Sequence, residues 1–260
     1  MDAGAVLLDI DGVLVTSWEA IPGAIRTLER LRESSVPFRL VTNTTTHTRY
    51  ELAATLNGGG FDVTPAEIHT AVVATAAYLR THHPGARVAL LSDGDPRGDL
   101  QGVVLVAPGD PADVVVVGGA SSDFTYPALN AVFRSLMDGA ALVAMHRNRY
   151  WRTAEGLQLD AGAYVAALED ATGVTATVCG KPSAAFFGAA VDDLGLPVAR
   201  VVMVGDDVAN DVLGAQAAGI RGVLVRTGKF RPSDLERADA APDAVIDSIA
   251  DLPPLLWGGG

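Results

Sequence analysis

The sequence is poor in cysteine, in long apolar runs and in positive charge. It has one cysteine, Cys179, which excludes an internal disulfide framework and is typical of a protein from a reducing compartment. Its apolar runs are short, and none approaches the roughly 20 residues that a membrane-spanning helix needs. The first residues lack the basic segment that begins a signal peptide. We therefore expect a soluble, cytoplasmic protein with no membrane partner.

Positive charge is also scarce. Lysine and arginine together number 19 against 31 acidic residues, which gives a formal net charge of -12. Because nucleic-acid phosphates are bound by basic patches, nucleic acid is not an expected partner. An anionic small molecule would need local neutralisation by a metal ion or by a few cationic side chains. The only two lysines are Lys181 and Lys229, so we ask what each of them does.

What the sequence does contain is an alternation of apolar strands and helical segments through its 260 residues, of which 49% are hydrophobic. This alternation is typical of an α/β protein with a mostly parallel sheet covered by helices, so we predict a Rossmann-like core. Residues 1–84 and 180–260 form the core in this interpretation. Residues 85–179 carry their own strand–helix series and are predicted to be an inserted α/β domain. The reason is that the polar strand ends of the first segment, described next, recur only after residue 179.

Three predicted strands end in polar residues: "VLLDID", "FRLVTNTT" and "VVMVGDD". The carboxyl ends of parallel strands share one edge of a sheet, which is where open α/β sheets bind ligands. If these strands are neighbours, one crevice gathers Asp9, Asp11, Thr42, Asn43, Asp206 and Asp207. Carboxylates gathered in this way repel one another, and a hard divalent cation with oxygen ligands relieves that repulsion. The pattern therefore predicts a Mg²⁺ site that also binds substrate phosphate.

Four motifs stand in a fixed order along the chain: "DIDGVL", "VTNTT", "GKP" and "VGDDVAND". They resemble the four motifs of the haloacid dehalogenase (HAD) superfamily of phosphohydrolases. The insertion resembles the α/β, C2-type cap of its NagD-like branch. Three further stretches, "DGAALVAMHRNRYW", "GKPSAAFF" and "VRTGKFRPSD", are similar to the part of that branch that holds phospholysine phosphohistidine inorganic pyrophosphate phosphatase and haloacid dehalogenase-like hydrolase domain-containing protein 2. The resemblance implies a HAD catalytic core with an inserted cap domain.

The same resemblance implies catalytic roles for three residues. Asp9 is expected to be the nucleophile that accepts the phosphoryl group, and also a metal ligand. Asp11 is expected to protonate the leaving group and then to activate water, while its backbone carbonyl binds the metal. Lys181 is expected to neutralise Asp9 and the phosphate.

The other matching residues are expected to bind phosphate or metal. Thr42 and Asn43 would hydrogen-bond the phosphoryl oxygens, and Asp206 would bind Mg²⁺ directly. Asp211 would hold a metal-bound water or orient the catalytic lysine. Asp207 would support these ligands without binding the metal itself. The alternative is an ordinary stabilising role, since acidic residues are common at helix N-termini.

Substrate selection is expected to lie in the cap. His146, Asn148 and Tyr150 follow the apolar segment "ALVAM", where relatives place a substrate-selecting loop. A structural role is the alternative for each of the three. Cap and core must move to admit substrate, so the linkers near Pro84 and Cys179 are expected hinges. The branch also implies a homodimer formed through the cap.

Three functions are open at this point. The first is a Mg²⁺-dependent phosphatase that hydrolyses a small phosphorylated metabolite through an aspartyl-phosphate. The second is a phosphoramidase or inorganic pyrophosphatase of the same family. Animal members of the branch carry serine at the position of Asp11, whereas the aspartate of this chain favours ester hydrolysis, in which the alkoxide leaving group needs a proton. The third is a phospho-accepting or metal-binding domain without catalysis. Receiver domains of signalling proteins are of this kind, but they are much shorter than this chain and lack a large insertion.

Overall fold

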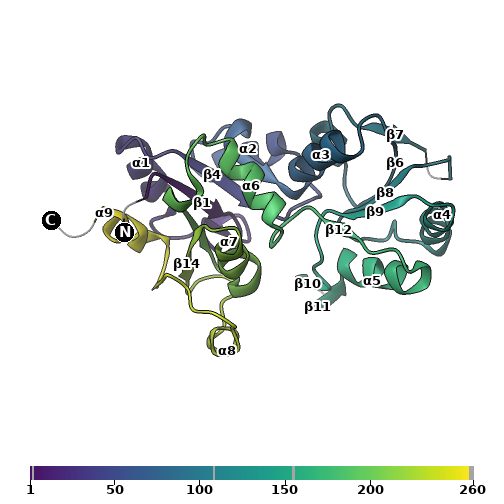
Figure 1. Cartoon of the computed structure of the whole chain (residues 1–260). Helices are drawn as coiled ribbons and strands as arrows, with labels where there is room; N and C mark the ends of the chain where they lie inside the picture. Colours follow the sequence, from purple (N-terminus) through teal and green to yellow (C-terminus); the bar gives the residue numbers. More distant parts are fainter. Residues whose placement is uncertain (2, 108, 154–155, 258–260) are drawn as a thin grey trace. The chain divides into compact units, whose positions relative to one another are not determined.

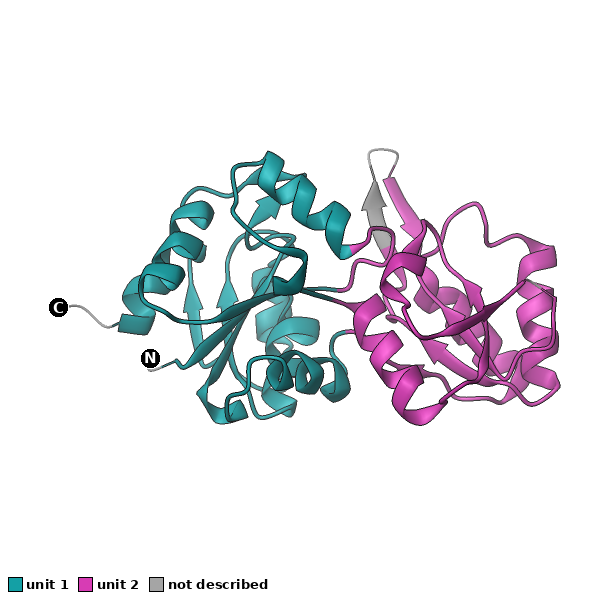
Figure 2. Cartoon of the chain, turned by 90° about the horizontal axis from the view of Figure 1, so that it is seen from above, with its two compact units in different colours: residues 1–42, 49–69, 181–260 teal, residues 43–48, 70–180 magenta. Residues whose placement is uncertain are grey.

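The chain divides into two units, and each contains its own parallel sheet (Figure 1, Figure 2). The computed structural model describes residues 1, 3–107, 109–153 and 156–257. Unit 1 consists of residues 1–42, 49–69 and 181–260, shown in teal in Figure 2, and unit 2 of residues 43–48 and 70–180, shown in magenta. The predicted α/β class, with a Rossmann-like core and an inserted α/β domain, is confirmed.

The sheet of unit 1 has the strand order β15-β14-β13-β1-β4-β5. Its strands are β1 (Ala5–Asp9), β4 (Phe38–Thr42), β5 (Ile68–Thr70), β13 (Val201–Gly205), β14 (Arg221–Val225) and β15 (Ala244–Ile246). The strands from β15 through β4 pair in parallel, with Leu8 opposite Val204 and Asp9 opposite Val41. This register brings the carboxyl ends of β1, β4 and β13 to one edge, where the sequence predicts the polar strand ends to meet.

Helical segments pack on both faces of this sheet because successive strand residues point to opposite sides. One face contacts α1 (Ala24–Glu33), α2 (Arg49–Gly58) and α9 (Leu252–Trp257), and Leu28 and Leu31 of α1 are buried there at helical spacing. On the other face, Leu224 of β14 packs with Val208 and Val212. The remaining elements of unit 1 are β2 (Val15–Thr16), β3 (Glu19–Ala20), η1 (Pro65–Glu67), α6 (Ala184–Asp192), η3 (Val198–Arg200), the π-helical turn η4 (Val208–Leu213), α7 (Gly214–Ala217), α8 (Pro232–Glu236) and η5 (Ile249–Asp251).

The sheet of unit 2 has the strand order β12-β9-β8-β6-β7, and all its pairs are parallel. Its strands are β6 (Arg87–Leu91), β7 (Val104–Val106), β8 (Val114–Val117), β9 (Ala141–Ala144) and β12 (Thr177–Val178). The central strand β8 consists of four buried valines, as expected for a parallel strand covered on both faces. The covering helices are α3 (Ala71–His82) on one face and α4 (Tyr126–Met137) and α5 (Ala161–Thr172) on the other; η2 (Pro96–Asp99) follows β6.

Helix α3 lies in unit 2, whereas the predicted boundary at residue 84 assigns it to the core. Its apolar residues explain the difference, because Val72 and Leu79 are buried together with Val88 of β6 and Val116 of β8. The chain passes between the units at residues 42–43, 48–49, 69–70 and 180–181. The predicted hinge at Cys179 therefore lies next to a crossing, and the one at Pro84 lies inside unit 2.

An antiparallel hairpin in unit 2 is absent from the predicted elements. It consists of β10 (Tyr150–Thr153) and β11 (Gly156–Leu159), with Tyr150 opposite Leu159. Among the helices that the structure describes, none has the length and apolar character needed to cross a membrane. The homodimer through the cap stays a prediction.

Candidate active site

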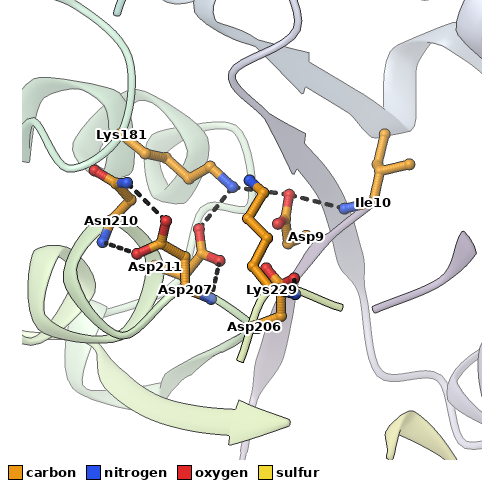
Figure 3. A network of polar contacts seen from close by, with 8 residues as sticks. All are labelled: Asp9, Ile10, Lys181, Asp206, Asp207, Asn210, Asp211 and Lys229. Carbon is orange, nitrogen blue, oxygen red and sulfur yellow. Dashed lines mark hydrogen bonds and ion pairs between the residues drawn. The ribbon is translucent and has the colours of Figure 1, made fainter. Parts of the chain in front are cut away.

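Asp9 lies at the end of β1, and the residue is only 5% exposed. Its Oδ1 accepts a hydrogen bond from the backbone N–H of Ile10 at 2.9 Å and another from Lys181 Nζ at 2.8 Å (Figure 3). Burial raises the pKa of Asp9, and the charge of Lys181 acts in the opposite direction. The lysine therefore favours the ionised carboxylate that nucleophilic attack requires.

Lys181 joins two buried carboxylates. Its Nζ lies 2.8 Å from Asp9 Oδ1 and 2.7 Å from Asp211 Oδ1, and the side chain is 4% exposed (Figure 3). Burial alone lowers the pKa of a lysine, but the charges of Asp211 and Asp9 outweigh this and raise the pKa of Lys181. The ammonium is therefore fixed and charged beside the nucleophile, as predicted from the "GKP" motif.

Asp9, Asp206 and Asp211 form a group that suits a divalent cation. All three are buried, and one carboxylate oxygen from each lies within 4.8 Å of the others. Oδ1 of Asp206 is buried and has no hydrogen-bond partner among the residues that the structure describes. An unsatisfied buried carboxylate oxygen is costly unless a cation binds it, so these oxygen donors fit Mg²⁺.

The pKa values of the two acids on the β13 side agree with this interpretation. Burial and the charge of Asp211 raise the pKa of Asp206 to about 6. Burial and the charge of Asp9 raise the pKa of Asp211 to about 7. Without a cation, each acid is thus close to binding a proton near neutral pH, and a metal ion would replace that proton.

Asp207 has a different task from its neighbours. Its Oδ1 accepts from the backbone N–H groups of Ala209 at 3.1 Å and Asn210 at 2.9 Å, and its Oδ2 accepts from Asn210 Nδ2 at 2.8 Å (Figure 3). The carboxylate thus caps η4. Its backbone N–H donates to Asp211 Oδ2 at 3.2 Å, so Asp207 orients Asp211 and, through it, Lys181.

The loop after β14 adds a residue that the sequence reasoning assigned to no site. The backbone N–H of Lys229 donates to Asp206 Oδ2 at 2.6 Å. A Cβ on either Gly12 or Gly228 would lie 2.0 Å from that same oxygen, so both loops must carry glycine there. Desolvation lowers the pKa of Lys229, but Asp9 and Asp206 raise it by more. The sequence pointed to this position in two ways, through the rarity of lysine in the chain and through the stretch "VRTGKFRPSD" that contains it.

The remaining predicted core residues lie at the same strand ends. Thr42 is the last residue of β4 and is buried, one position beyond the residue that pairs with Asp9. Asp11 follows β1 by two residues and is exposed, and desolvation raises the pKa of its carboxyl against the opposing charges of Lys229 and Lys181. Asn43 is half-buried and is grouped with unit 2, and its hydrogen bond to a phosphoryl oxygen stays a prediction.

The three predicted cap residues have different surroundings within unit 2. His146 is buried just after β9, and its Nδ1 accepts from the backbone N–H of Asn148 at 3.3 Å. The carbonyl of Asn148 accepts from the N–H of Gly162 at 2.8 Å, which ties this loop to α5. Tyr150 begins β10 and is 62% exposed. These contacts support a structural role for His146, and substrate contact by any of the three stays a prediction.

Comparison with known proteins finds matches along most of the chain. Residues 6–104 match the family model of haloacid dehalogenase-like hydrolases, and residues 178–252 match the HAD-hydrolase-like model. Haloacid dehalogenase-like hydrolase domain-containing protein 2 from Bos taurus is 42% identical over 245 residues, which cover 94% of this chain and 92% of that protein. Phospholysine phosphohistidine inorganic pyrophosphate phosphatase from Danio rerio is 39% identical over 251 residues, 94% of this chain and 91% of that protein.

Solved structures share the whole fold. NagD from E. coli has a TM-score of 0.87 and 26% identity, covering 96% of this chain and 98% of that one. A glycerol phosphate phosphatase from Mycobacterium tuberculosis, solved in complex with magnesium, has a TM-score of 0.88 and 28% identity, covering 96% of this chain and 76% of that one.

Proposed function

The chain belongs to the haloacid dehalogenase-like hydrolase family, in its NagD-like branch, and as a member of this family it is a phosphoric monoester hydrolase; we propose that it is a Mg²⁺-dependent phosphatase acting on a small phosphorylated metabolite. One observation carries the proposal. A buried carboxylate, Asp9 Oδ1, is held by Lys181 at 2.8 Å beside two further buried acids, and one of these has an unsatisfied oxygen.

The residues of this chain divide the reaction between them. Asp9 attacks phosphorus and becomes an aspartyl-phosphate, while Lys181 balances the charge of the carboxylate and of the phosphoryl oxygens. Asp11 gives a proton to the departing oxygen and then takes one from the attacking water, a task that suits its exposed position. Thr42, buried at the end of β4, donates its hydroxyl to the phosphoryl group.

Mg²⁺ is the cation proposed for the acidic group. Asp9, Asp206 and the backbone carbonyl of Asp11 would hold it, and Asp211 would hold it directly or through a bound water. The magnesium complex of the mycobacterial phosphatase supports the choice of ion. When bound, it would supply positive charge to the phosphoryl oxygens and offset the repulsion between the carboxylates.

Phosphate release from a panel of phosphate esters, pyrophosphate and phosphoramidates tests the proposal. We expect release from at least one small ester with Mg²⁺, none with EDTA, and a loss of at least about a thousandfold in Asp9→Asn, because an amide does not replace a carboxylate nucleophile. Asp192→Asn, at the last residue of α6, is a matched control that keeps full activity. Full activity in Asp9→Asn, or in EDTA, contradicts the mechanism.

A second candidate follows from the similarity to phospholysine phosphohistidine inorganic pyrophosphate phosphatase. It is a phosphoramidase or inorganic pyrophosphatase that uses the same residues. The same panel separates the two candidates, since a preference of kcat/KM for P–N or P–O–P bonds over every ester selects the second. Asp11 supports the ester, because an alkoxide leaving group needs the proton that an aspartic acid provides.

A further inference from the structure

Lys229 stands on a loop that three interactions fix against the acidic group. The hydroxyl of Thr227 donates to the backbone carbonyl of Gly12. Gly228 approaches Gly12 and Asp206 too closely for any side chain on either glycine. The backbone N–H of Lys229 then donates to Asp206 Oδ2 at 2.6 Å. The start of the Lys229 side chain is thus held at the active site by its own backbone.

The two lysines of the chain meet at this site but are used differently. Lys181 is buried and its ammonium contacts two carboxylates, Asp9 and Asp211. The Lys229 side chain extends towards Asp9 and Lys181 in Figure 3, and its charge interacts with theirs and with that of Asp206. It is exposed, and among the described parts of the chain no carboxylate lies within ion-pair distance, 4.0 Å, of its Nζ. Its donors are therefore available to a ligand.

Two ammonium groups close together repel each other unless an anion lies between them or beside both. Asp9 and Asp211 are bound to Lys181, Asp206 is bound through Oδ2 to the backbone of residue 229, and Asp206 Oδ1 is left for the proposed cation. The charge of Lys229 also acts on that of Asp11, the proposed proton donor, but forms no ion pair with it among the described residues. The missing partner is a further anion next to Asp9. In the proposed reaction, the group that comes to Asp9 is a phosphoryl group, whose non-bridging oxygens accept charge-assisted hydrogen bonds.

We propose that Lys229 is a second phosphoryl-binding lysine, whose ammonium donates to a non-bridging oxygen of the group that Asp9 attacks. This inference rests on the proposed phosphatase function. It assigns two separate tasks to one residue: the backbone N–H orients Asp206, and the side chain binds the oxyanion. Replacement of the side chain removes the second task and leaves the first.

The test measures two ligands separately on Lys229→Met, by calorimetry on the full chain. With Mg²⁺ present, the affinity for orthovanadate, an analogue of the phosphoryl group, falls about tenfold to a hundredfold, the effect of one charge-assisted hydrogen bond. The affinity for Mg²⁺ alone stays the same or rises, because a cation next to the carboxylates has been removed. Lys229→Arg recovers most of the vanadate affinity. Arg226→Met removes an equal charge from the same loop, at an exposed side chain paired with Asp247, and changes neither affinity.

Two results overturn the inference. Vanadate affinity in Lys229→Met within twofold of wild type shows that the ammonium does not bind the oxyanion. A joint loss of Mg²⁺ and vanadate affinity shows that the residue acts only through Asp206. Failure of the proposed function has a separate signature, since a wild type that binds vanadate through Lys229 but releases phosphate from no substrate is an oxyanion-binding protein and not a phosphatase.

Discussion

The two units contain the same architecture, a parallel sheet covered by helices, but their strand ends differ in chemistry. In unit 1, buried acids at or just after strand ends, Asp9 and Asp206, are held by lysine side-chain and backbone donors. In unit 2, β8 is followed by two glycines, and the N–H of Gly119 donates to Thr45 Oγ1 at 2.9 Å. After β9, the ring of His146 accepts from the backbone two residues later. At these two strand ends of unit 2, the polar groups named here are paired with groups of the same unit.

The difference shows what a parallel sheet provides and what it does not. The carboxyl edge of such a sheet is a recurrent place for ligands, and both units have one. Only a strand end that buries charge without satisfying it creates a demand for a cation or an anion. Within the described residues, the one group of acids that suits a metal ion is at the edge of unit 1.

The largest expected effect comes from Lys181→Met, which leaves Asp9 and Asp211 buried without their shared cation. We expect kcat/KM for phosphate release to fall by at least about a thousandfold, because charge stabilisation of the phosphoryl group is lost. Removal of one partner from a buried ion pair also lowers the free energy of unfolding, by about 3–5 kcal/mol. Urea unfolding and initial rates measure the two effects. Lys181→Met with normal turnover would contradict the assigned role.

A smaller effect concerns Mg²⁺ and pH. The raised pKa values, about 6 for Asp206 and about 7 for Asp211, mean that these carboxyls favour the folded state when protonated at low pH and lose that contribution as the pH rises through 6 to 7. Mg²⁺ competes with these protons, so its apparent affinity rises about tenfold to a hundredfold from pH 5.5 to pH 8. The shift of Tm with Mg²⁺ concentration measures it at each pH. Equal affinities at both pH values would exclude these carboxyls as the ligands.

The smallest effect on activity is expected in unit 2. His146→Ala removes a buried side chain and the acceptor of the Asn148 N–H, which costs about 2–3 kcal/mol of unfolding free energy. Because His146 is buried and its ring accepts from the backbone of its own loop, kcat/KM is expected to stay within about threefold of wild type. Thermal unfolding and initial rates on the preferred ester measure the two effects. A tenfold rise in KM without a loss of stability would instead support the substrate contact predicted from the sequence.

Much of this arrangement follows from the sequence because its determinants are local. An apolar run that ends in Asp9 predicts a buried strand with a polar end, and the structure has β1 there. The order of the four motifs also predicts that Asp9, Lys181, Asp206 and Asp211 meet, and the structure brings them together.

The features that the sequence did not predict depend on contacts between residues far apart in the chain. The assignment of α3 to unit 2 depends on which sheet buries Leu79, and helical periodicity does not contain that information. The hairpin of β10 and β11 pairs Tyr150 with Leu159, and both are exposed. Residues 156–159 of β11 do not alternate between buried and exposed positions, so the usual sequence signal of a strand is missing there. The place of Lys229 is set by its backbone bond to an acid 23 residues earlier.

Gly12 and Gly228 carry no chemical group, yet both touch the oxygen of Asp206 that the Lys229 backbone binds. There is no room between the two loops for even one methyl group. The position of the proposed metal ligand Asp206 thus depends partly on the absence of a side chain at two positions far apart in the chain. A survey of functional groups would pass over both, although an alanine at either one would displace the carboxylate as surely as a change in Asp206 itself.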